Sequence, residues 1–163
     1  MTPPLFADNL QIGVTNKWAK NMKARVNINC DEVWRSNDYP MNQAVVEPEG
    51  RRIHLTGQVA WDTSFNVLHA GDAAAQTRAT FDNIKIVLEA AGGTLDDIVT
   101  LTTFYVREED KDSITETRRS ILNKEFGPAT TGIQVAKIWD NDLLVEIVAT
   151  AVIPEERFRE PDY

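Results

Sequence analysis

Alternation of apolar and polar residues marks several short segments of the chain as β-strands. Three of them lie in the first third of the chain, at residues 25–29, 43–46 and 52–56. Three more are expected where β-branched and aromatic residues gather, at residues 98–106, 131–138 and 143–153. The turn-forming residues 47–50 separate the second strand from the third, which predicts a hairpin between these two strands.

Helical periodicity dominates the segment between the third and fourth strands. The predicted helix begins after Asp72, a residue type that caps helix N-termini, and stops at the pair Gly92–Gly93. Its core-facing positions are Ala74, Thr77, Phe81, Ile84, Leu88 and Ala91. The polar helix residues Gln76 and Asn83 are expected to be solvated or capping groups rather than ligands.

A second helix is predicted between the fourth and fifth strands. Ser113 and Glu116 have the spacing of a capping box, which makes Ser113 the N-cap of the helix. The apolar side continues until Gly127 and Pro128 end the helix. The element order β-β-β-α-β-α-β-β then predicts an α+β fold with both helices packed on one face of a mixed sheet.

The last strand is apolar on both of its sides. Leu144 and Val148 point one way, and Val145 and Ile147 point the other way. Two helices on one face leave the opposite face of the sheet uncovered. Because such a surface is most simply buried against other copies of the chain, we expect a homo-oligomer.

Length and charge narrow the possible classes of protein. The 163 residues suffice for one domain, expected at residues 24–163 after an N-terminal extension at residues 1–23 that lacks a clean period. No apolar run is long enough to cross a bilayer, so we expect no membrane partner. The formal net charge of −8 disfavours binding to a nucleic-acid backbone.

Cysteine and histidine are scarce. Cys30 is the only cysteine, so the chain can form neither an internal disulfide nor a thiolate zinc site. His54 and His69 are the only histidines, and no acidic cluster surrounds them, so we expect no metal. The first residues contain no visible secretory signal, and together these features favour a cytoplasmic protein.

One carboxylate interrupts the apolar run of the last strand. Glu146 lies between Val145 and Ile147. Removing an unpaired carboxylate from water costs several kcal/mol, so a strand that keeps one pairs it, leaves it at a wet edge or uses it. Glu146 is therefore the candidate catalytic residue, and the alternative is an outward-facing glutamate on an exposed strand.

Several local patterns occur in a characteristic order along the chain. They are Pro40–Val45, Leu55–Val59, Gly71–Asp72 with Gln76–Thr77, Asn83–Ile84, Ala90–Gly93, Pro128–Ala129 and Val145–Ile147. In this order they resemble the Rid family, also called the YjgF or reactive intermediate deaminase family, over roughly residues 25–153. The resemblance implies a chorismate-mutase-like α+β subunit, a homotrimer and small-molecule pockets at the subunit interfaces. It further implies hydrolysis of enamines and imines, especially 2-imino acids, without a cofactor.

The resemblance also assigns site residues. The family's water-handling glutamate falls on Glu146 and its pocket serine on Thr56. Its substrate-binding arginine falls on Thr130, and its pocket tyrosine falls on Met41, where the nearby Tyr39 could substitute. The other predicted substrate-binding residues are Thr131 and Trp139.

Some of these assignments have a simpler alternative. On an alternating strand Thr56 would share a face with His54 and Gln58, forming a polar strip, although an ordinary strand threonine explains it equally well. Trp61 and Trp139 could line a cleft, and the alternative is aromatic packing at a subunit contact.

The threonine at position 130 changes the expected substrate. A threonine hydroxyl cannot replace the bidentate, charged contact that an arginine makes with a carboxylate, so we expect little hydrolysis of simple 2-imino acids. Other arginines could reach a carboxylate from another direction; they are Arg25, Arg51, Arg52 and Arg107.

The sequence therefore favours a Rid-family hydrolase in which Glu146 positions a water against a C=N carbon or protonates the leaving nitrogen. The alternative is a trimeric ligand-binding or regulatory protein that keeps the cleft without the chemistry. A ribonuclease activity is disfavoured, because the chain is acidic and lacks a histidine pair for acid–base catalysis.

Overall fold

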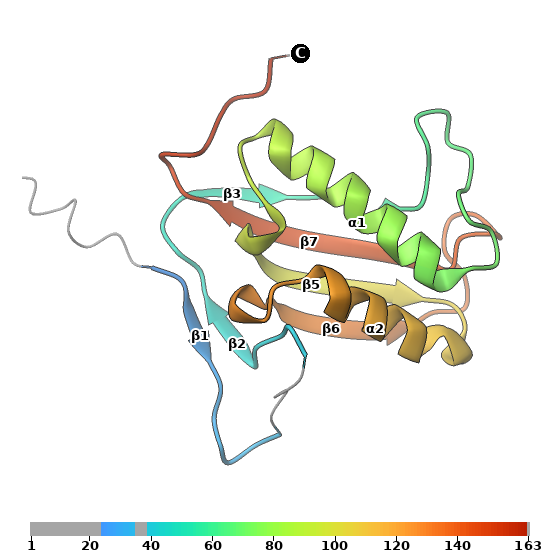
Figure 1. The fold of residues 1–163 in the computed structure, drawn as a ribbon, viewed down its shortest axis with the longest axis horizontal. Helices are drawn as coiled ribbons and strands as arrows, with labels where there is room; N and C mark the ends of the chain where they lie inside the picture. The colour runs from blue at the N-terminus through green and yellow to red at the C-terminus, as the bar shows by residue number, and fades with distance from the viewer. Residues whose placement is uncertain (1–23, 35–38, 163) are drawn as a thin grey trace, which may run out of the picture.

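A mixed sheet carries both α-helices on one face (Figure 1). The computed structural model describes residues 24–34 and 39–162, so the expected N-terminal extension lies outside the described residues. The strands are β1 (Val26–Ile28), β2 (Ala44–Val46), β3 (Arg51–His54), β4 (Gln58–Val59), β5 (Ile98–Tyr105), β6 (Ala129–Gln134) and β7 (Val145–Ile153). The helices are α1 (Ala73–Ala90) and α2 (Lys111–Ile121), with short 3-10 turns η1 (Leu95–Asp97), η2 (Glu108–Asp110) and η3 (Lys124–Phe126).

The larger sheet has the strand order β3-β7-β5-β6. β4 also pairs with β7, on the same edge as β3 and nearer the N-terminal end of β7. β5 and β6 are parallel, and the other pairs in this sheet are antiparallel. A parallel pair needs a crossover connection, which α2 provides between β5 and β6. The prediction of a mixed sheet with both helices on one face is confirmed. None of the helices in the described ranges has the length and apolarity of a membrane span.

The predicted hairpin between the second and third strands is wrong. β2 pairs with β1 in a separate two-stranded sheet, and β3 pairs with β7. A Cβ atom at Gly50 would lie 2.3 Å from the carbonyl oxygen of Ile153, so glycine lets the chain pass very close to the end of β7. Long-range pairing with β7 therefore overrides the local turn signal.

Helix α1 begins and ends as the sequence predicts. The Asp72 side chain accepts a hydrogen bond of 2.9 Å from the backbone N–H of Ala75, which confirms the N-cap. Gly92 adopts a φ of +81°, and the N–H of Gly93 donates to the carbonyl of Leu88, which terminates the helix. The buried residues of the helix are Ala73, Gln76, Thr77, Thr80, Phe81, Ile84 and Leu88.

Helix α2 starts three residues earlier than predicted and ends five residues earlier. Its N-cap is Asp110, and the Ser113 hydroxyl donates to the Asp110 carbonyl from inside the first turn, so the predicted capping box is wrong. The acidic turn η2 immediately before α2 extends the helical path toward the N-terminus. At the other end Leu122 is extended and buried, because its side chain packs into the core.

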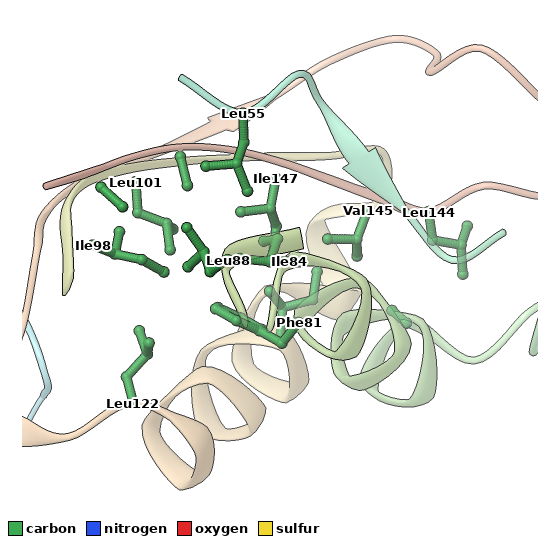
Figure 2. Close-up of a cluster of buried hydrophobic side chains, with 14 residues drawn as sticks. Leu55, Phe81, Ile84, Leu88, Ile98, Leu101, Leu122, Leu144, Val145 and Ile147 are labelled. Carbon is green, nitrogen blue, oxygen red and sulfur yellow. The ribbon is translucent and has the colours of Figure 1, made fainter. Parts of the chain in front are cut away.

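The main core lies between the helices and the sheet. Figure 2 shows Phe81, Ile84 and Leu88 of α1 converging on side chains from β5 and β7. Each large apolar side chain that is fully buried contributes about 1.5–3 kcal/mol. A smaller cluster of Val59, Ile138 and Leu143 packs beside the loop between β6 and β7.

None of the helices in residues 24–34 and 39–162 lies over the opposite side of the sheet, which we call the open face (Figure 1). It consists of Thr100, Thr102 and Phe104 of β5, Thr131 and Ile133 of β6, and Glu146, Val148 and Thr150 of β7. Val148 is 36% exposed and Ile133 is 40% exposed. The last strand therefore has apolar residues on both sides, as predicted, and the described helices cover only one of these sides.

Two amide side chains of α1 hold the segments on either side of Glu146. The Oε1 atom of Gln76 accepts from the N–H of Leu144 (2.8 Å), and its Nε2 donates to the carbonyl of Asp142 (2.7 Å). The Nδ2 of Asn83 donates to the carbonyl of Val59 (2.9 Å). Gln76 is completely buried, so the expectation that it is solvated is wrong.

Replacing Gln76 by leucine roughly keeps the side-chain volume and removes both hydrogen bonds to the residues just before β7, Asp142 and Leu144. Because the buried N–H of Leu144 then loses its partner, we expect a loss of about 2–4 kcal/mol in the free energy of unfolding. Urea unfolding at a fixed protein concentration measures this loss. Asp82→Asn, on the exposed side of the same helix, should change stability by less than about 0.5 kcal/mol. A Gln76→Leu loss below about 1 kcal/mol would contradict the assigned role.

Candidate functional site

Glu146 lies in a pocket with aromatic and aliphatic walls, which we call the Glu146 pocket. β4 runs antiparallel to β7 and places Val59 opposite Glu146. The pocket has a volume of about 740 Å³, and its lining residues are Gly57, Val59, Trp61, Phe65, Lys137, Ile138, Trp139 and Glu146. The predicted residue Trp139 is 83% exposed and therefore forms an outer wall.

A register shift between β3 and β4 creates the space for the carboxylate. His54 pairs opposite Thr150, whereas Gln58 pairs opposite Ile147, so these two side chains lie on different faces of the sheet. The predicted polar strip of His54, Thr56 and Gln58 is therefore wrong. Gly57 lies at this shift, and a Cβ atom there would lie 1.9 Å from Oε1 of Glu146.

The Glu146 side chain is half-buried, and its carboxylate has no hydrogen bond or ion pair within residues 24–34 and 39–162. Lys137 lines the same pocket without forming an ion pair with it. Trp61 and Phe65 pack edge to face, with ring centroids 5.5 Å apart. A free carboxylate against apolar walls can accept a proton from water or hold an N–H group of a ligand.

Thr56 adjoins this pocket from the other side of Gly57. Its side chain is exposed, and it lines a neighbouring hollow of about 610 Å³ that shares Gly57, Trp61 and Phe65 with the Glu146 pocket. The structure thus brings Thr56 close to the candidate carboxylate, although β3 has already ended at His54.

Three further predicted residues gather in a second pocket, which we call the Thr130 pocket. Tyr39, Met41 and Thr130 line this space of about 280 Å³. Gly127 permits the assembly, because a Cβ atom there would lie 2.5 Å from the backbone nitrogen of Met41. The N–H of Asn42 then donates to the carbonyl of Pro128 and fixes the segment beside β6.

Arg118 also lines the Thr130 pocket, and the sequence analysis missed it. Its Nη2 atom donates to Oγ1 of Thr130 at 2.5 Å, and its Nε is buried without a partner among the described residues. Burial lowers the pKa of Arg118 to about 10, so the guanidinium remains protonated at neutral pH. Its spacing along the sequence could have indicated an inward-facing position, because Arg118 lies on one stripe of α2 with Ile114, Thr117 and Ile121.

The four arginines named as possible substitutes have other partners. Arg51 pairs with Glu155, Arg52 with Glu47, Arg107 with Asp110, and Arg25 donates to backbone carbonyls that include that of Gly127. A separate cavity of about 500 Å³ near Arg25 and Arg157 contains none of the predicted site residues. The Arg157 guanidinium there already pairs with Asp97, and this hydrogen bond raises the pKa of Arg157.

The two pockets lie on opposite faces of the sheet. Thr130 is in register with Leu101, whose side chain is buried beneath the helices. Glu146 is in register with Phe104 on the open face, where the predicted residue Thr131 is exposed. One chain therefore does not bring Thr130, Met41 or Tyr39 to Glu146.

The fold and these pockets define a class of small α+β proteins with two helices on one face of a mixed sheet. The chain belongs to the Rid family, also known as the YjgF or RutC family. The family model described as Endoribonuclease L-PSP matches residues 35–153. The predicted family is confirmed.

Known relatives agree with this assignment. A RutC family protein of Pyrococcus horikoshii is 31% identical over 112 residues, which cover 69% of this chain and 86% of that protein. The RutC family protein UK114 of Drosophila melanogaster is 33% identical over 113 residues, covering 69% of this chain and 79% of UK114. The crystal structure of the Rid family protein YyfB from Yersinia pestis matches with a TM-score of 0.72 at 32% identity, covering 79% of this chain and 98% of YyfB.

Gly57→Ala should displace the Glu146 carboxylate without unfolding the protein, because the end of a glutamate side chain can move at little cost. The added Cβ would lie 1.9 Å from Oε1, whereas contacts below 3.0 Å essentially never occur, so the oxygen should move by more than about 1 Å. Crystal structures of the wild type and the variant measure this shift. Gly132→Ala is the matched control, since a Cβ atom there meets nothing within 4 Å. An unmoved carboxylate in Gly57→Ala would contradict the described contact.

Proposed function

We propose that this chain is a hydrolase of C=N bonds, an enamine or imine deaminase in which Glu146 activates water. One observation carries the proposal: Glu146 presents an unpaired, half-buried carboxylate in a pocket with aromatic walls. Membership of the Rid family supports this class of reaction.

The chemistry requires one proton acceptor that later becomes a proton donor. A water oxygen attacks the imine carbon while the Glu146 carboxylate accepts a proton from that water. The resulting carboxylic acid returns the proton to the nitrogen, which gives a carbinolamine. Glu146 then transfers the hydroxyl proton of the carbinolamine to its nitrogen, the C–N bond breaks, and ammonia leaves as the carbonyl product forms. An enamine first tautomerises to the imine and then follows the same path. The aromatic walls provide apolar contact for the body of the substrate.

The proposed enzyme is a homotrimer with its ligand sites between subunits. The open face leaves Val148 and Ile133 partly exposed, and a second copy of the chain would cover them. Because the Glu146 pocket and the Thr130 pocket lie on opposite faces, a second copy would also be needed to unite them in one site. The proposed substrate is other than a simple 2-imino acid, because Thr130 lacks a guanidinium.

Glu146→Gln should keep the fold, since the amide is nearly isosteric, and should lower the rate of imine hydrolysis by about 100-fold or more. The rate is measured as ammonia release from imines generated in situ from a panel of amino acids. Glu109→Gln, an exposed change of the same kind in η2, should leave the rate unaltered. Full activity in Glu146→Gln would refute the proposed role. A wild type that binds ligands without turnover would instead indicate a binding or regulatory protein of the same fold.

Sedimentation equilibrium should give a mass of about 55 kDa, three times the chain mass of 18.3 kDa. Val148→Lys places a charge on the open face and should shift the protein toward the monomer, because burying an unpaired ammonium is costly. A wild-type monomer at micromolar concentration would remove both the trimer and the site between subunits.

A further inference from the structure

Arg118 is a largely desolvated cation for which the described chain provides no anion. No carboxylate pairs with it in the part of the chain that the structure describes, and its recorded hydrogen bond goes to the neutral hydroxyl of Thr130. Its neighbour Arg119 differs, because it is exposed, lies 3.7 Å from Glu116 and stacks over the Tyr39 ring.

Holding an unpaired guanidinium out of water is costly, and the cost is reduced when an anion is bound beside it. The guanidinium has five N–H donors, of which one reaches Thr130. The side chain lines the Thr130 pocket, so a ligand there would meet a cation with free donor capacity.

The lining of this pocket is positively charged in an acidic protein. The described residues that line it include Arg118 and Arg119 and no aspartate or glutamate, although the whole chain has a net charge of −8. Tyr39, Pro40 and Met41 provide apolar contact, and the volume of about 280 Å³ suits a small molecule. These features favour a small organic anion.

The position of the charge is informative. The Arg118 guanidinium comes from helix α2 and contacts the hydroxyl of Thr130 on strand β6, one of the predicted substrate-binding residues. The structure thus places a cation beside a predicted ligand-binding position.

We propose that Arg118 anchors the carboxylate of a small organic ligand in the Thr130 pocket, and that the Thr130 hydroxyl orients the guanidinium. This inference rests on the proposed function in one respect: for the deaminase, it makes Arg118 the residue that positions the substrate.

Calorimetric titration with benzoate and with benzamide tests the inference without turnover, because these probes differ mainly in charge. The full-length wild type at neutral pH and low salt should bind benzoate at least about tenfold more tightly than benzamide. Arg118→Met, which keeps the length and apolar stem, should abolish this preference. Arg118→Lys should keep part of it, because lysine retains the charge without the planar fork. Arg78→Met removes an exposed arginine from α1 and should leave the preference unchanged.

Three results would overturn the inference: equal binding of benzoate and benzamide by the wild type, binding of neither, or an unchanged preference in Arg118→Met. Arg119→Met separates the two neighbouring arginines, and loss of the preference only in that variant would also overturn it. Circular dichroism verifies folding, and Arg118→Gln serves if Arg118→Met does not fold. A protein that binds benzoate through Arg118 but hydrolyses no imine would refute the deaminase and leave this inference standing.

Discussion

The hydrogen bonds between the buried Gln76 side chain and the backbone ahead of β7 fix the strand that carries Glu146. An amide has both a donor and an acceptor, so one side chain satisfies the carbonyl of Asp142 and the N–H of Leu144. From that point β7 runs between β5 and the β3–β4 edge, with alternate residues in the core. The inward residues are determined by packing, and this leaves Glu146 on the open face. The position of the carboxylate is therefore a consequence of how α1 holds the start of the strand.

The distribution of charge between the two pockets constrains the chemistry. Among the described residues, Glu146 provides a negative charge and Arg118 a positive charge, neither of which forms an ion pair, and they lie on opposite faces of the sheet. A substrate with a carboxylate and a C=N group would suit both, since the guanidinium binds the anion and the carboxylate handles the protons of water. Separation of these groups within a chain keeps them from neutralising each other. A site built from two copies of the chain would therefore combine the Glu146 carboxylate with the Arg118 guanidinium, which lie in separate pockets of one chain.

Local patterns predicted the elements, whereas long-range contacts decided their partners. The Asp72 cap and the Gly92–Gly93 stop define α1 through interactions within a few residues, so the sequence was sufficient there. The expected hairpin failed because the competing partner of β3 is a strand about 100 residues later, which no turn signal can indicate. Gln76 was misassigned for a similar reason: its polarity favours solvent, but its partners lie 66 and 68 residues away.

In the candidate site, too, local patterns could be recognised from the sequence, whereas long-range contacts could not. Glu146 could be found from sequence, because a charge inside an apolar run is visible without a structure. Arg118 could not be assigned to Thr130, because the two positions are joined only when α2 packs beside β6. The sequence resemblance led us to expect no substrate-binding arginine at position 130, yet a binding site depends on where a guanidinium lies and not on which element supplies it. The threonine at position 130 is thus better understood together with Arg118, as one hydrogen-bonded pair, than as the absence of an arginine.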